Sequence, residues 1–105
     1  MTYIKRGEIW TVYNSPNKSS IREVVVLTNN DYNKSSISNL YTVVPLEGYG
    51  STYEHPYDVR IRGKNVAIDL IRTVHIDLFK DKKAPASDKD MRNISDAIIK
   101  HLNLN

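Results

Sequence analysis

The most distinctive pattern in this sequence is a run of four apolar residues, Val24–Leu27, three of which are β-branched. The run is too short for a helix and suits a strand that is covered on both faces. Polar clusters at 17–20 and 28–31 bracket it, as expected where a strand begins and ends. Arg22 stands at the entrance to this strand. Spacing alone favours a solvated flanking position for Arg22, and a functional group held on a rigid scaffold is the alternative.

Other short apolar stretches predict further strands on either side of this one. Pro45 near the end of one stretch indicates a sheet edge or a strand exit. The polar segment 29–39 receives no assignment beyond one short helical turn, and the charged segment 80–83 is typical of a solvated turn. We expect the additional strands at 8–13, 40–46, 57–61, 66–70 and 71–76.

One amphipathic helix is expected at 88–102. Ser87 is a suitable N-cap, and Asp90 three residues later completes an approximate capping box. An apolar stripe at helical spacing follows, which indicates a core-facing helix rather than a cofactor site. The stripe consists of Met91, Ile94, Ala97, Ile98 and Leu102.

These elements predict a mainly β, β-rich α+β fold. About six short strands joined by short loops favour an antiparallel sheet that curls into a small barrel or half-barrel, with the helix as its cap. The chain of 105 residues suffices for one domain over 1–105 with a modest core.

Composition narrows the classes of function. The chain has no Cys, which excludes disulfides, thiolate chemistry and Cys-based metal sites, and we expect a cytoplasmic protein with no membrane segment. Its net charge of +3 and pI near 9.2 allow a polyanionic partner. Seven Tyr residues are generous for a small domain and would suit a binding groove, although Tyr is also a good strand former.

Several common catalytic patterns are missing from the sequence. The four Gly residues never take the spacing of a phosphate-binding loop, and no Ser stands in a nucleophile elbow. His55, His75 and His101 are scattered rather than paired at a metal-binding spacing. We therefore expect neither a covalent nucleophile nor a bound metal or cofactor.

A looser set of residues points to RNA. Arg22 ends one polar loop, Glu47 opens the next, and His55 lies near the end of that second loop. In a small barrel these loops would meet at one rim. Arg neutralises phosphate and Tyr stacks on unpaired bases. A carboxylate or imidazole beside an Arg could also support cleavage of RNA by its own 2′-hydroxyl.

Four segments carry a resemblance that covers nearly the whole chain. They are Arg6–Trp10 (RGEIW), Arg22–Asp31 (REVVVLTNND), Thr42–Leu46 (TVVPL) and Asp69–Val74 (DLIRTV). In this order, and followed by a final helix, they resemble the RGDI-W, RPVVV-S-ND, VVP and DQIRTV segments of the MazF/PemK/Kid-type toxins, which are endoribonucleases of toxin–antitoxin systems. Each segment alone is generic, and the ordered set is fairly specific.

The resemblance implies an SH3-like, CcdB-like barrel that forms a homodimer and pairs with an acidic antitoxin. It implies cleavage of single-stranded RNA without a metal or cofactor, leaving a cyclic phosphate. The position of the family's catalytic Arg is Arg22, and Glu47 and His55 are the candidates for moving the proton. The expected RNA-binding residues are Lys5, Arg6, Tyr49, Ser51, Thr52 and Tyr53.

The chain departs from the family at two positions beside this site. Glu23 stands where the family has Pro, and a carboxylate there is expected to compete with the substrate phosphate for Arg22. Glu47 stands where the family usually has Thr or Ser. The alternative is therefore a barrel of altered or lost activity that binds a protein or nucleic acid. Its binding surface would be the groove or a basic rim made of Lys5, Arg6, Arg60, Arg62 and Lys64.

Overall fold

A computed structural model describes residues 3–18, 20–35, 37, 39–48 and 57–103 of the 105-residue chain. Short 3₁₀ turns at Ile68–Leu70 and Ile76–Leu78 flank the sixth strand. Among the described residues no helix is long and apolar enough to cross a membrane. The elements are β1 (Ile9–Tyr13), β2 (Ile21–Val26), α1 (Asn30–Asn33), β3 (Leu40–Glu47), β4 (Arg60–Ile61), β5 (Lys64–Val66), β6 (Arg72–His75), β7 (Phe79–Lys82) and α2 (Asp88–Leu102).

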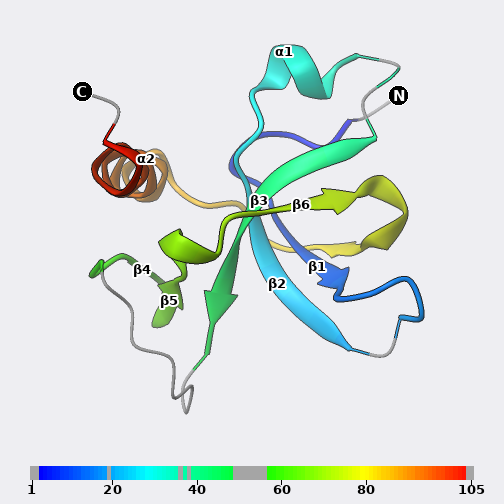
Figure 1. Ribbon diagram of the computed structural model, residues 1–105, viewed down its shortest axis with the longest axis horizontal. Coiled ribbons are helices and arrows are strands. Elements are labelled where there is room, and N and C mark those ends of the chain that lie inside the picture. Colours follow the sequence, from blue (N-terminus) through cyan, green and yellow to red (C-terminus); the bar gives the residue numbers. More distant parts are fainter. Residues whose placement is uncertain (1–2, 19, 36, 38, 49–56, 104–105) are drawn as a thin grey trace.

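The strands form one antiparallel sheet in the order β4-β5-β3-β2-β1-β7, with β6 also paired to β3. Within the described ranges no ladder joins β7 back to β4, so the curled sheet stays unclosed. Figure 1 shows α2 beside β4 and β5, and α1 near the start of β3. The predicted β-rich fold with an antiparallel sheet and a C-terminal helix is confirmed, with seven strands where about six were expected.

Three predictions about strands need correction. The strand expected at 57–61 is a strand only over β4, Arg60–Ile61. The stretch expected as a strand at 66–70 is mostly the 3₁₀ turn, and β5 ends at Val66. The segment expected as a solvated turn, 80–83, lies largely in β7, whose backbone pairs with β1 through a register shift beside Thr11. Phe79 packs against the core at the start of β7, while the charged residues after it face water. Charged side chains are suited to such an edge because they discourage further strand pairing.

β2 lies between two apolar cores, which explains its uninterrupted apolar run. Val25 faces the core beneath α2, whereas Val24 and Val26 face a second core on the opposite side of the sheet, and all three side chains are 0% exposed. We call these the helix-side core and the strand-side core. The helix-side core consists of Ile9, Val25, Leu27, Val44, Leu46, Val59, Ile61, Val66, Ile68, Ile94 and Ala97. The strand-side core consists of Ile4, Val12, Val24, Val26, Tyr41, Val43 and Val74.

Pro45 lies inside β3 rather than at its end, at the point where the outer edge of the strand changes partner. Pairing with β6 extends along β3 to Val43, and pairing with β5 begins at Leu46. The Pro45 carbonyl accepts a bond from the Ala67 amide at 3.0 Å, so its nitrogen faces the gap between β6 and β5. The missing N–H therefore removes no ladder bond, which is the condition under which a sheet tolerates proline.

A tight hairpin turn at Arg62 and Gly63 joins β4 to β5. Both residues have positive φ, 51° and 80°, as a two-residue turn that matches the sheet twist requires. Arg62 is an uncommon residue in this conformation. Its guanidinium donates to the carbonyls of Ala84 and Pro85 at 3.1 and 2.8 Å, which ties the turn to the segment before α2.

The helix α2 begins and ends as the sequence predicts. Ser87 and Asp90 form the reciprocal capping box, and Asn103 closes the helix in the left-handed conformation. Ile94 and Ala97 are buried in the helix-side core, and Leu102 at the end of the predicted stripe is 53% exposed. The stripe is thus core over most of its length and reaches solvent in the last turn.

Arg6 ties three segments together next to the end of β2. Its guanidinium donates to the Leu27 carbonyl and, at 3.1 Å, to the Ser95 hydroxyl on α2. Its backbone amide donates to the Asn30 side chain at 2.8 Å, which holds α1. Arg6 therefore has a structural role that the sequence pattern did not indicate.

We expect Ile94→Ala to lower the free energy of unfolding by about 2–5 kcal/mol, because the side chain is 0% exposed and its removal leaves a cavity under α2. Ile99→Ala on the same helix, at a side chain that is 37% exposed, should cost less than about 1 kcal/mol. Urea unfolding followed by circular dichroism measures both, and equal losses would contradict the position of α2.

We also expect Arg6→Ala to cost about 1–2 kcal/mol, because it leaves the Leu27 carbonyl and the Ser95 hydroxyl without their charged donor. The matched control is Arg60→Ala, whose ion pair with Asp58 is exposed and should contribute less than about 0.5 kcal/mol. Urea midpoints that shift by the same amount in both variants would show that the Arg6 contacts do not stabilise the fold.

Candidate functional site

Arg22 and Glu47 meet across two neighbouring strands. Val24 of β2 pairs with Pro45 of β3. Because the strands are antiparallel, moving two residues back along β2 and two residues forward along β3 places Arg22 opposite Glu47. Directly opposed residues of an antiparallel pair point to the same face. One guanidinium nitrogen, Nη1, donates to Glu47 Oε1 at 3.1 Å, and the two side chains are 34% and 17% exposed. The structure therefore brings together two of the three predicted catalytic residues.

The strand-side core fixes the place where Arg22 emerges. Alternation along β2 puts Arg22 on the same face as Val24 and Val26, which are fully buried in that core. Its partner in β1 is Val12, which is also 0% exposed. The guanidinium thus stands at the rim of the core on a rigid strand.

Glu23 points to the other face of β2, where Val25 enters the helix-side core. Its carboxylate pairs with the Lys64 ammonium. The expectation that Glu23 competes for Arg22 is therefore wrong, because a one-residue step along a strand reverses the side-chain direction. The carboxylate that pairs with Arg22 is Glu47.

Arg72 lies on the same face as Arg22 and was not singled out from the sequence. It opens β6 opposite Val43, and Val43 in turn pairs with Val26. Arg72 lies two strands away from Arg22 and four residues away along the direction of β3. In a flat sheet this offset places their Cα atoms roughly 16 Å apart. The alternation in 71–76, which puts Arg72 on the side of the buried Val74, was the signal that could have identified it.

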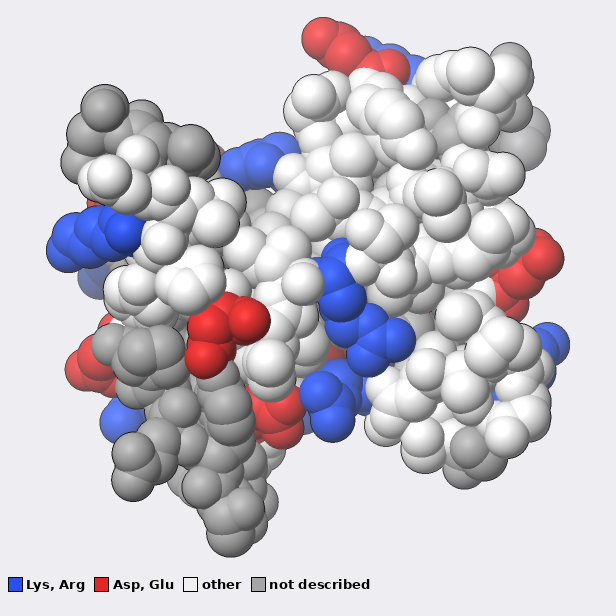
Figure 2. All heavy atoms as spheres, in the orientation of Figure 1, with Lys and Arg blue, Asp and Glu red and all other residues white. Residues whose placement is uncertain are grey.

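Basic side chains also gather in the space-filling view. Figure 2 shows Lys and Arg near the centre of the face in view, over the region where β3 and β6 cross in Figure 1, with acidic side chains beside them. A short row of cations on one face is suited to a chain of phosphates.

Two of the predicted RNA-binding residues, Lys5 and Arg6, are not brought to this position. Lys5 and Arg6 lie beside the opposite end of β2, where the Gly7 amide donates to Val26 and the Arg6 guanidinium to Leu27. Lys5 Nζ lies 5.6 Å from the centre of the Tyr3 ring. A second group lies outside the described residues, and its roles stay predictions. That group comprises Tyr49, Ser51, Thr52, Tyr53 and His55.

Three further titratable side chains have contacts that explain their positions. His75 Nδ1 accepts from the Asp77 amide at 3.1 Å and caps a 3₁₀ turn. His101 Nδ1 lies 3.1 Å from the Tyr57 hydroxyl, which joins the end of α2 to the approach to β4. Burial, with a smaller contribution from Tyr32, raises the pKa of Tyr41 above its ordinary value of 10.0, so its hydroxyl is neutral at physiological pH.

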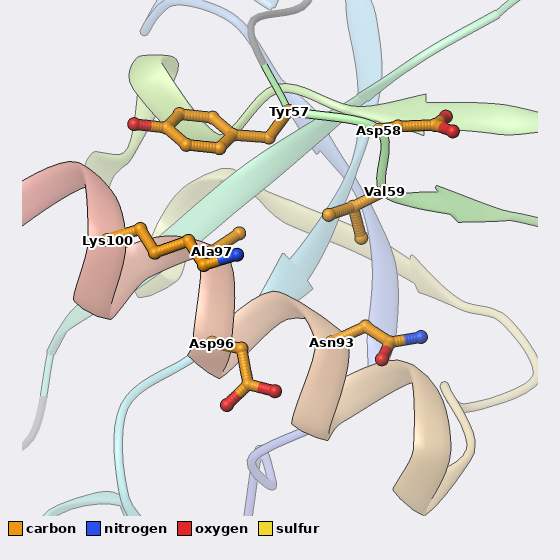
Figure 3. A pocket seen from close by; sticks show the side chains of 7 residues that line it. All are labelled: Tyr57, Asp58, Val59, Asn93, Asp96, Ala97 and Lys100. Atoms are coloured by element: carbon orange, nitrogen blue, oxygen red, sulfur yellow. The ribbon is translucent and has the colours of Figure 1, made fainter.

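A separate open hollow of about 460 Å³ lies between α2 and the segment 57–59. Figure 3 shows the segment 57–59 across from the helix, with Val59 directed toward α2 and the carboxylate of Asp58 directed away from it; the helix residues that line the hollow are Asn93, Asp96, Ala97 and Lys100. Two carboxylates against one ammonium make this hollow a poor site for a polyanion. Within the described part of the chain, no three His, Asp or Glu side chains gather as metal ligands.

The fold matches solved structures along its whole length. A mycobacterial endoribonuclease in complex with its cognate antitoxin aligns with a TM-score of 0.76 and 20% identity, covering 100% of this chain and 98% of that one. A second mycobacterial endoribonuclease gives 0.72 and 19%, covering 98% and 94%. A MazE–MazF crystal structure from Deinococcus radiodurans gives 0.70 and 16%, covering 99% and 100%. At these identities the likeness shows the fold.

The sequence itself identifies the family. No curated protein sequence matches the chain. Residues 5–102, however, match the family model described as PemK-like, MazF-like toxin of type II toxin–antitoxin system. This range holds β1 through α2 and both members of the Arg22–Glu47 pair. The chain therefore belongs to the PemK-like, MazF-like toxins of type II toxin–antitoxin systems.

Proposed function

We propose that this toxin is an endoribonuclease that cuts single-stranded RNA without a metal or cofactor. The observation that carries the proposal is the Arg22–Glu47 pair, a cation and a carboxylate 3.1 Å apart on one face of two rigid strands. Cleavage of RNA by its own 2′-hydroxyl needs charge stabilisation at the phosphate and a proton acceptor beside it. These two residue types supply both functions.

In the proposed reaction, the Arg22 guanidinium binds the non-bridging oxygens of the scissile phosphate. Glu47 accepts the proton of the adjacent 2′-hydroxyl as that oxygen attacks phosphorus. The bond from phosphorus to the 5′-oxygen breaks, and His55 donates a proton to the leaving oxygen. The products are a 2′,3′-cyclic phosphate and a 5′-hydroxyl end. Arg22 stabilises the extra negative charge that the phosphoryl oxygens carry during the attack.

Arg72 is proposed to hold a second phosphate of the same strand. It shares the face of Arg22 and lies two strands away, so a short unpaired segment can reach both cations. Because unpaired bases are free to stack, the predicted contacts of Tyr49 and Tyr53 with bases belong to the same proposal. Double-stranded RNA is stiffer and hides its bases, which favours unpaired substrates at this site.

The proposed partners follow from the family and from charge. An acidic antitoxin suits a chain of net charge +3, and two of the similar structures are an endoribonuclease with its cognate antitoxin and MazF with MazE. We further propose a homodimer that works in the cytoplasm. The apolar side chains exposed outside the two cores, such as Leu40 at 47% and Ile76 at 39%, are available for contact with another chain.

A second candidate is a barrel that binds RNA or protein without cutting. The observation in its favour is that Glu47 already holds Arg22, where the family resemblance expects a hydroxyl. The basic rim suggested for this alternative is largely engaged in the fold. Arg62 donates to two carbonyls, Lys64 pairs with Glu23, and Arg6 ties α1 to α2.

We expect purified protein to cut a long, mostly unpaired RNA at discrete sites in the presence of EDTA, and Arg22→Ala to slow cutting by about 10²–10³-fold. The matched control is Arg92→Ala, which removes one exposed cation on α2, on the other side of the sheet from Arg22, and should leave the rate unchanged. Sequencing of the RNA ends gives the sites and the rate. Uncut RNA, with no growth arrest on expression, would favour the binding-only candidate.

We expect Arg72→Ala to act on binding more than on the chemical step. It should weaken RNA binding several-fold and reduce the slope of log K against log salt by about 0.7, the value for one phosphate contact on a single strand. Fluorescence anisotropy at several salt concentrations measures this slope. An unchanged slope would remove Arg72 from the RNA-binding surface.

A further inference from the structure

The Arg22–Glu47 pair has the geometry of a bound anion. Glu47 Oε1 accepts from Arg22 Nη1 at 3.1 Å, as a phosphate oxygen would in a complex. With the carboxylate side chain only 17% exposed, the pair has limited access to water. Glu47 therefore lies where a phosphate bound to Arg22 through the same nitrogen would have to lie.

Both ends of this pair are fixed by backbone pairing. Arg22 pairs with Val12 of β1, and Glu47 pairs with Asn65 of β5 at the outer edge of β3. The two side chains meet across the central β2–β3 ladder. The pair is thus preorganised, and it does not depend on a loop that happens to fold over the site.

We propose that Glu47 is an intramolecular competitor that the substrate phosphate must displace from Arg22 before the site can bind RNA. This inference rests on the proposed function and adds a step of regulation to it. When a phosphate takes the guanidinium, the carboxylate is released from its partner and becomes available to accept the 2′-hydroxyl proton. Binding of the correct group and release of the base are then one event.

The exchange also makes the site selective for polyanions. When a single anion binds Arg22, it forms one contact, but Arg22 gives up its contact with Glu47. The net gain in binding free energy is therefore small. An RNA segment that also reaches Arg72, on the same face, keeps that second contact as a surplus. The proposed competitor therefore favours chains of several phosphates over isolated anions.

The test compares Glu47→Gln with Glu23→Gln by fluorescence anisotropy, using an unpaired RNA whose 2′-hydroxyls are replaced by hydrogen so that it cannot be cut. Gln keeps the size of the side chain and removes its charge. Glu23 is the matched control, because it is one residue from Arg22, points to the opposite face and pairs with Lys64. Both variants change the net charge by the same amount.

We expect Glu47→Gln to bind roughly two- to fivefold more tightly than the wild type, the range of a partly exposed ion pair. Glu23→Gln should show a smaller gain. In an Arg22→Ala background, the gain from Glu47→Gln should fall to that of the control. With cleavable RNA, Glu47→Gln should lower both KM and kcat, since it binds more tightly and lacks the base.

Binding by Glu47→Gln that is equal to or weaker than that of the wild type, while Arg22→Ala still weakens binding, would overturn the competitor and leave the proposed function intact. A gain of the same size in both Gln variants would overturn it as well, because it would show a general effect of charge. If Arg22→Ala changes neither binding nor cutting, the proposed function itself fails, and the competitor fails with it.

Discussion

The burial of β2 on both faces is the constraint on which the rest of this fold depends. Val24 and Val26 fill the strand-side core, and Val25 fills the helix-side core, so the strand has no freedom to slide or rotate. A shift of one residue would exchange the two sets of side chains, and in one direction it would put Glu23 in the fully buried place of Val24. The same constraint fixes which charged residues at the start of the strand face each other. Arg22 and Glu23 are neighbours in sequence, yet they belong to ion pairs on opposite faces.

Much of the fold could be predicted because its strongest signals are local. The four-residue apolar run, the strand expected at 8–13 and the capped stripe of α2 each have a direct physical cause, and the structure confirms all three. β7 could not be predicted in this way. Three of its four residues are charged, and it is a strand because its backbone pairs with β1. Pairing between distant segments leaves little trace in the composition of an edge strand.

The candidate site also has one part that the sequence predicts and one part that depends on pairing between distant segments. Arg22 was named as a site residue from the family resemblance, since its spacing alone favoured a solvated flank. Glu47 was named from its loop, but its contact with Arg22 is a product of the register between β2 and β3, which no single segment encodes. Arg6 was assigned to RNA from its charge, whereas its guanidinium and amide hold Leu27, Asn30 and Ser95. Charge indicates what a side chain can bind, and only packing decides which partner is within reach.

Pro45 has a consequence for how the sheet assembles. β6 and β5 compete for the same outer edge of β3, and either could in principle pair two residues farther along it. Such a shifted pairing would meet the ring nitrogen of Pro45, which has no hydrogen to donate, and would lose a bond. The proline therefore acts as a spacer that penalises misaligned sheets during folding. Because β6 carries Arg72 and β3 ends in Glu47, this one missing hydrogen helps to set how far apart the charges of the site are held.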